Sequence, residues 1–141
     1  MDANSQGSVA MVSVLLVDDH VPTRQEMRRL VEVQDDMQVV AECGSGEDAI
    51  LTARRLRPDI VIMDIVLPGI TGVEATIAIV KDLPGTRVLA LSNHSGRNLV
   101  RAVLDAGAVG FVRKNHAFEE LIPAIRAACA GKRFLGLQVN E

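Results

Sequence analysis

The sequence predicts an α/β fold, a doubly wound parallel sheet with helices on both faces. Five short apolar segments rich in Val, Ile and Leu alternate along the 141 residues with segments of helical periodicity. Strands that alternate with helices in this way are typical of parallel sheets. Apolar residues make up 48% of the chain and aromatic residues only 2%, which indicates an aliphatic core. The length fits a single domain.

The first half of the chain contains two predicted strand–helix units, with strands at 11–18 and 37–43 and helices at about 22–34 and 47–56. Pro22 suits the first turn of its helix, and Arg-Pro at 57 and 58 ends the second one. Three arginines, Arg24, Arg28 and Arg29, are expected on the solvated side of the first helix.

The segment 59–64 is the most informative strand. Its run of Ile, Val and Met has no polar alternation, which is typical of a strand covered on both faces. Pro68 and Gly69 then turn the chain, so we expect Asp64 at the carboxyl end of this strand. Open α/β sheets bind their ligands at that edge.

The second half continues the alternation, with predicted helices at about 72–81, 98–106 and 118–130 and strands at 86–92 and 109–114. Leu83-Pro84-Gly85 and Gly107-Ala108 separate these elements. Residues 1–10 are polar and are expected to be a disordered leader, whereas 11–131 form the domain. Residues 132–141 are expected to be a tail or the start of a linker.

Composition argues against several classes of function. The net charge of −3 has the wrong sign for a surface that grips nucleic acid, so direct binding of DNA is not expected. The chain opens without a signal sequence and has no apolar run of membrane-spanning length, which suggests a cytoplasmic protein with no membrane contact. Cys43 and Cys129 stand among small or apolar neighbours and are predicted to be buried free thiols.

Polar side chains stand where four of the five predicted strands end: Asp18 and Asp19, Asp64, Ser92, and Lys114. The carboxyl ends of parallel strands share one edge of the sheet, so these groups should meet there. Three carboxylates repel one another unless a cation neutralises them, and oxygen ligands suit Mg²⁺. Such a site can carry phosphoryl chemistry. Asp64 would be the nucleophile that forms an acyl phosphate, with its charge screened by the metal and Lys114.

Over about residues 12–133 the chain resembles the receiver domains of bacterial two-component response regulators. The matching pieces are Val14 to His20, Arg24, Pro58 to Asp64, Leu67-Pro68-Gly69 with Gly72, Leu91-Ser92, and Gly107 to Lys114. Together, and in this order, they are specific. Asp-Asp-His, Leu-Ser and the Gly-Ala-X-Gly-Phe run before the lysine are similar to the NarL/FixJ (LuxR-type) subfamily.

The resemblance implies a flavodoxin-like (CheY-like) five-stranded sheet of order 2-1-3-4-5 with five helices. It also implies a signalling switch that accepts a phosphoryl group on Asp64 from a sensor histidine kinase. Such a protein is not an enzyme beyond its own phosphorylation and dephosphorylation. Mg²⁺ would be bound directly by Asp19, Asp64 and the backbone carbonyl of Val66, and mainly through water by Asp18.

The resemblance further assigns the residues of the switch. Ser92 would bond a phosphoryl oxygen, and Lys114 would pair with the phosphoryl group. Phe111 takes the place of the switch aromatic, which moves inward together with the serine. Val66 and His94 occupy positions that modulate the loss of the phosphoryl group.

The output of the switch stays open at this point. The subfamily features favour control of transcription through a C-terminal DNA-binding domain that is not in this chain, with a possible homodimer on phosphorylation. The alternative is a stand-alone regulator that acts by protein contact. A haloacid-dehalogenase-type Mg²⁺ phosphatase competes less well, because Asp18-Asp19 lacks its Asp-x-Asp spacing. A flavin- or nucleotide-binding module is also disfavoured, because this chain has no glycine-rich phosphate loop after its first strand.

Overall fold

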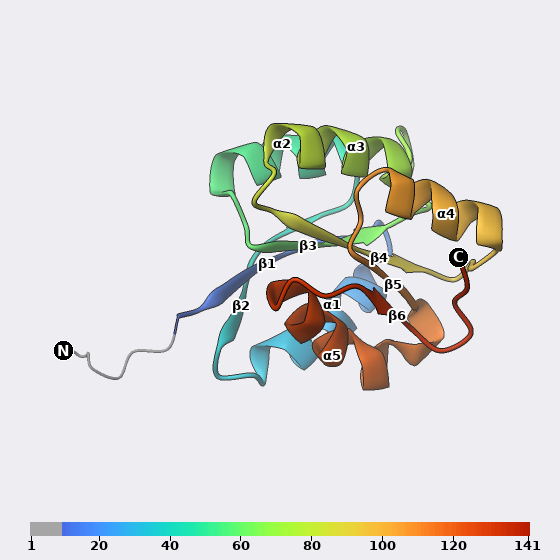
Figure 1. The fold of residues 1–141 in the computed structure, drawn as a ribbon. Coiled ribbons are helices and arrows are strands. Elements are labelled where there is room, and N and C mark those ends of the chain that lie inside the picture. Colours follow the sequence, from blue (N-terminus) through green and yellow to red (C-terminus); the bar gives the residue numbers. More distant parts are fainter. Residues whose placement is uncertain (1–9) are drawn as a thin grey trace.

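A computed structural model describes residues 10–141 and shows the predicted α/β fold (Figure 1). The strands are β1 (Val12–Val17), β2 (Met37–Cys43), β3 (Ile60–Asp64), β4 (Arg87–Ser92), β5 (Gly110–Arg113) and β6 (Phe134–Leu135). The helices are α1 (Val21–Glu32), α2 (Gly46–Leu56), α3 (Gly72–Asp82), α4 (Arg97–Asp105) and α5 (Ala117–Cys129), with a short 3₁₀ turn, η1 (Lys114–His116), before α5. The leader predicted at 1–10 lies, apart from Ala10, outside the described residues.

The strands form one parallel sheet in the order β2-β1-β3-β4-β5-β6. The predicted order 2-1-3-4-5 is therefore confirmed. Strand β2 lies on one side of β1, and the chain then continues through β3, β4 and β5 on the other side of β1. The carboxyl ends of β1 and β3 meet at that switch point, which is where sheets of this kind bind ligands.

A short sixth strand departs from the prediction of five. In β6, Phe134 and Leu135 pair with Gly110 and Phe111 of β5. The backbone N–H of Gly136 then donates to the carbonyl of Phe111 at 2.9 Å, and the side chain of Val139 is buried in the core. Residues 134–139 therefore pack against the domain, and the first two of them extend its sheet.

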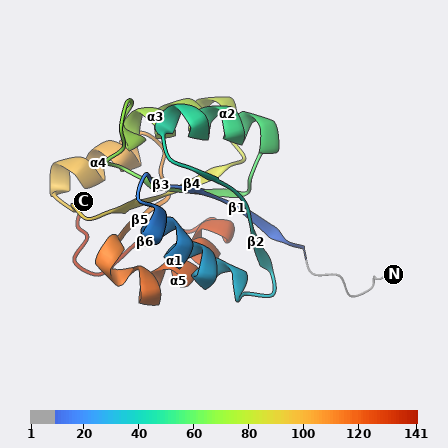
Figure 2. The same cartoon turned by 180° about the vertical axis from the view of Figure 1, so that it is seen from behind.

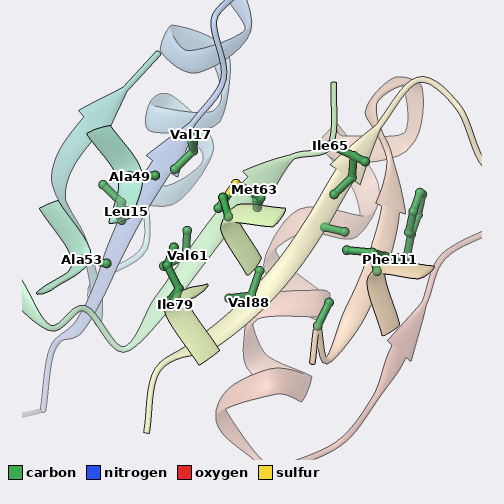
Figure 3. Packing of buried hydrophobic residues seen from close by; sticks show 14 of the residues in the cluster. Leu15, Val17, Ala49, Ala53, Val61, Met63, Ile65, Ile79, Val88 and Phe111 are labelled. Atoms are coloured by element: carbon green, nitrogen blue, oxygen red, sulfur yellow. The ribbon is translucent and has the colours of Figure 1, made fainter. Parts of the chain in front are cut away.

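The helices form two layers, with α2, α3 and α4 on one face of the sheet and α1 and α5 on the other (Figures 1 and 2). Successive strand residues point to opposite faces, so each strand contributes to two cores. Leu15 and Val17 of β1 join the core under α2 and α3 (Figure 3), whereas Val14 and Leu16 join the core under α1 and α5. This is why the central strand β3 is apolar up to Asp64, without polar alternation.

The start of α3 fits closely against the end of β3. A side chain at Gly72 would place its Cβ 2.3 Å from the carbonyl oxygen of Asp64, so only glycine allows this approach. Thr71 caps the helix in a reciprocal capping box with Glu74. These two features fix the loop that follows Asp64.

The cysteine prediction is half right. Cys43 is buried, but Cys129 is exposed, because at the end of α5 it is Ala128 that faces the core. Within residues 10–141, none of the helices combines the length and the apolar character needed to cross a bilayer.

Candidate functional site

The structure brings the polar strand ends together at one edge of the sheet. Asp64 and Ser92 are the last residues of β3 and β4, Asp18 follows β1, and Lys114 follows β5. A groove of about 750 Å³ opens over Asp64, Ser92 and Lys114, whereas the fully buried Asp18 does not line it. Its lining includes Asp19, Asp64, Val66, Ser92, His94 and Lys114, together with Pro22, Thr23 and Glu26 of α1, Asn93 of the loop after β4, and Asn115 of η1.

Lys114 joins the two most buried carboxylates of the site. Its Nζ lies 2.8 Å from Oδ2 of Asp18 and 3.0 Å from Oδ2 of Asp64. Asp18 is fully buried, and Asp64 is 3% exposed. One ammonium group therefore compensates part of the charge of two carboxylates.

Burial and the contact with Lys114 act in opposite directions on the pKa values of this pair. Burial raises the pKa of Asp64, and the neighbouring charge of Asp18 raises it further, while the hydrogen bonds from Lys114 and from the Val66 N–H oppose the rise. Burial lowers the pKa of Lys114, but its hydrogen bonds to Asp18 and Asp64 outweigh that effect and raise it. Lys114 therefore stays cationic, and the burial and the neighbouring negative charge of Asp18 both disfavour the ionised form of Asp64, which Lys114 stabilises.

The three aspartates form a cluster that can hold a metal ion. One carboxylate oxygen from each of Asp18, Asp19 and Asp64 lies within 4.8 Å of the others. In the part of the chain that the structure describes, Lys114 is the one cation in salt-bridge contact with this cluster, which leaves an excess of negative charge. Asp19 is the exposed member of this cluster, and Asp18 and Asp64 are buried. A cluster of hard oxygen donors beside an open groove fits Mg²⁺, which keeps several of its waters.

Ser92 and Phe111 lie in different surroundings. Ser92 is buried at the floor of the groove, where its Oγ accepts a hydrogen bond from the backbone N–H of His94 at 3.0 Å. Phe111 is fully buried in the core and pairs with Ala90, two residues before Ser92 on β4. Figure 3 shows its ring among the aliphatic side chains of the core. Val66 is 58% exposed at the groove.

The arginines of α1 correct one sequence interpretation. Arg24 was expected on a solvated face, but its side chain is only 18% exposed. It donates to the backbone carbonyl of Asp18 and to Glu42, and Arg28 also bonds Glu42. The acidic Glu42, paired with Leu16 in the β1–β2 register, was the signal in the sequence that could have indicated this contact.

Comparison with protein families gives a match to the response regulator receiver domain over residues 14–126. Response regulator GacA of Pseudomonas viridiflava is 37% identical over 131 residues, which cover 93% of this chain and 61% of that protein. Response regulator UvrY of Escherichia coli is also 37% identical over 131 residues, covering 93% of this chain and 60% of that protein. The chain thus spans about three fifths of the length of these curated relatives.

Solved structures of response regulators are similar to this chain as well. A two-component response regulator of the LuxR family from Aurantimonas sp. superposes with a TM-score of 0.85 at 38% identity, over 89% of each chain. The isolated receiver domain of RcsB from Salmonella enterica serovar Typhimurium, solved with a beryllofluoride phosphomimetic, gives a TM-score of 0.83 at 26% identity. That alignment covers 89% of this chain and 94% of the RcsB chain.

Proposed function

The chain belongs to the response regulator receiver family of two-component systems, and from this membership we propose that it is a switch controlled by phosphorylation of Asp64. The observation that carries the proposal is the meeting of a buried Asp64, Lys114 and two further carboxylates beneath an open groove. A nucleophilic carboxylate beside a fixed ammonium group is suited to attack on phosphorus.

In the proposed step, an oxygen of Asp64 attacks the phosphorus of a phosphohistidine on a sensor histidine kinase. The P–N bond breaks, its electron pair stays on the imidazole nitrogen, and an acyl phosphate forms on Asp64. Lys114, whose Nζ already lies 3.0 Å from Asp64 Oδ2, offsets the negative charge of the transferred group. The groove gives the partner's imidazole a path to the carboxylate.

Mg²⁺ is the proposed cofactor, because the acidic cluster carries more negative charge than Lys114 can balance. Asp19, Asp64 and the backbone carbonyl of Val66 would hold it directly, and Asp18 mainly through water. When bound, the ion supplies positive charge that stabilises the phosphoryl oxygens. Asp18 also orients Lys114, and so has a second part in the site.

Ser92 and Phe111 are the proposed relay. Ser92, whose Oγ accepts from the His94 N–H, would move to donate its hydroxyl hydrogen to a phosphoryl oxygen, and this change would reach Phe111 on the adjoining strand β5. His94 and Val66, which line the groove, would influence the lifetime of the phosphoryl group.

The proposed output is control of transcription through a DNA-binding domain outside this chain, with homodimer formation on phosphorylation. It is supported by the similarity to response regulators that are longer than this chain and to one of the LuxR family. A cytoplasmic location, typical of response regulators, is part of the proposal. The haloacid-dehalogenase-type phosphatase is not proposed, because the family match is to receiver domains.

Chemical trapping tests the identity of the acceptor. The protein is incubated with acetyl phosphate and Mg²⁺ and then reduced with borohydride, which converts an aspartyl phosphate to homoserine. We expect tandem mass spectrometry to find homoserine at position 64. Homoserine at 18 or 19 with none at 64 would contradict the assignment of Asp64.

A further inference from the structure

The turn that carries Asp18 and Asp19 is held in place by the side chain of Arg24. Arg24 lies in the first part of α1, and its Nη1 donates to the backbone carbonyl of Asp18 at 2.6 Å. Its Nε donates to Glu42 Oε1 at 3.0 Å. A Cβ built on Gly44 would lie 3.7 Å from Nη1 and 4.0 Å from Asp19 Cα. The guanidinium therefore fills the space between the turn after β1 and the turn after β2.

Asp19 depends on this support more than Asp18 does. The carboxylate of Asp18 is fixed by Lys114 and by the backbone N–H of His20 at 2.9 Å. Asp19 is exposed, and within the described residues its carboxylate takes part in no hydrogen bond or ion pair. The backbone of the turn is therefore what decides in which direction the Cα–Cβ bond of Asp19 points.

The backbone contact of Arg24 can set that direction. The carbonyl of Asp18 and the N–H of Asp19 belong to one planar peptide group, so a bond that fixes the carbonyl also fixes the plane from which Asp19 projects. Asp18 is also held at its own N–H, which donates to the carbonyl of Cys43 at 3.0 Å. The turn is thus clamped between β2 and α1.

Glu42 compensates the positive charge of Arg24, which would otherwise repel a cation bound nearby. It pairs with Arg24 and also with Arg28, whose Nη1 lies 2.5 Å from Glu42 Oε2. Burial raises the pKa of Glu42, but these two guanidinium groups outweigh burial and lower it, so Glu42 stays anionic. The charge of Arg24 is compensated, and what it presents to the acidic turn is a hydrogen bond in fixed geometry.

We propose that Arg24 is a positioning residue of the metal site, which fixes the direction of Asp19 through the peptide group that joins it to Asp18. The inference rests on the proposed function, since it concerns the ligands of the Mg²⁺ that the function requires. Residues that orient metal ligands typically change metal affinity roughly 10- to 100-fold when they are replaced.

The test compares the Mg²⁺ dissociation constants of purified variants by isothermal titration calorimetry. Arg28→Gln is the matched control, because it removes an equal charge and another bond to Glu42 but has no contact with Asp18. We expect Arg24→Gln to bind Mg²⁺ roughly 10- to 100-fold more weakly than the parent, and Arg28→Gln to stay within about twofold of it. Melting curves in Mg²⁺-free buffer show whether each variant is folded.

Arg24→Lys keeps the charge with one ammonium group, which cannot serve the Asp18 carbonyl and Glu42 in the same fork geometry. We expect its Mg²⁺ affinity to lie between those of the parent and Arg24→Gln, and it decides the matter if the glutamine variant does not fold. Parent-like affinity in a folded Arg24 variant, or an equal loss in Arg28→Gln, would overturn the role of Arg24. Absence of Mg²⁺ binding in the parent would instead count against the proposed function.

Discussion

Lys114 shows how one residue decides the electrostatics of the site. Asp18 and Asp64 lose most of their hydration in the fold, and the Lys114 ammonium bonds both of them. Removing one partner of such a group leaves buried charge without compensation, which costs far more than a surface ion pair contributes. Lys114 and a bound cation should therefore substitute for each other in stabilising the fold.

Replacing Lys114 by Gln should lower the free energy of unfolding in Mg²⁺-free buffer by roughly 3 kcal/mol, because two buried carboxylates keep their burial and lose their counter-charge. Mg²⁺ should then stabilise Lys114→Gln more than it stabilises the parent. Urea denaturation followed by circular dichroism measures both effects. The exposed Lys132 provides a control substitution of the same type. Equal stability of the two variants without Mg²⁺ would refute the account of Lys114.

Ser92→Ala should accept the phosphoryl group but switch incompletely. A hydrogen bond to a charged group contributes roughly 1.5 to 3 kcal/mol, whereas moving a population from 1:99 to 99:1 takes about 5.5 kcal/mol. Ser92 alone therefore cannot drive the switch, and its loss should remove only part of it. Hydrogen exchange with and without Mg²⁺ and beryllofluoride should show a reduced change over residues 98–128.

The control for that experiment is Ser95→Ala, a neighbouring serine that does not line the groove. It should show the full change in exchange. A full change in Ser92→Ala as well would contradict this division of labour between Ser92, Lys114 and the metal.

Among the secondary-structure elements, strands with long apolar runs could be predicted from the sequence, whereas short strands and contacts between distant segments could not. The strand ending at Asp64 could be predicted because both of its faces are buried, which leaves no polar alternation. The strand β6 has only two residues, too few to show a period, and its pairing with β5 comes from tertiary contact. Similarly, the position of the Arg24 side chain on α1 depends on its contact with Glu42 on β2. The convergence of Asp18, Asp64, Ser92 and Lys114 followed from parallel topology alone.

The segment after α5 gives a stability prediction. Val139 is 7% exposed and belongs to the same core cluster as Phe111, whereas Leu137 is 61% exposed. Val139→Ala should lower the free energy of unfolding by about 1.5 kcal/mol, from two buried methyl groups. Leu137→Ala, the matched control, should change it by less than about 0.5 kcal/mol. Chemical denaturation of the two variants measures the difference, and equal effects would mean that the segment does not pack as described.

At the scale of the whole molecule, the fold separates stability from chemistry. Two aliphatic cores on either side of the sheet hold the strands in place, and the polar strand ends meet at one edge, where the charges crowd. The sheet thus fixes carboxylates in a geometry that they would not adopt freely. The buried aspartates thus lie in a small domain whose two cores are built mainly from aliphatic side chains.

Intact-mass spectrometry after incubation with acetyl phosphate measures whether Asp64 is phosphorylated with the support of Mg²⁺. The parent is measured with Mg²⁺ and with the metal removed by a chelator, beside Asp64→Asn, which keeps the size of the side chain. We expect a gain of one phosphoryl group in the parent with Mg²⁺, and no gain without the metal or in the variant. A phosphoryl group on Asp64→Asn at the level of the parent, or one gained equally well without Mg²⁺, would contradict this expectation.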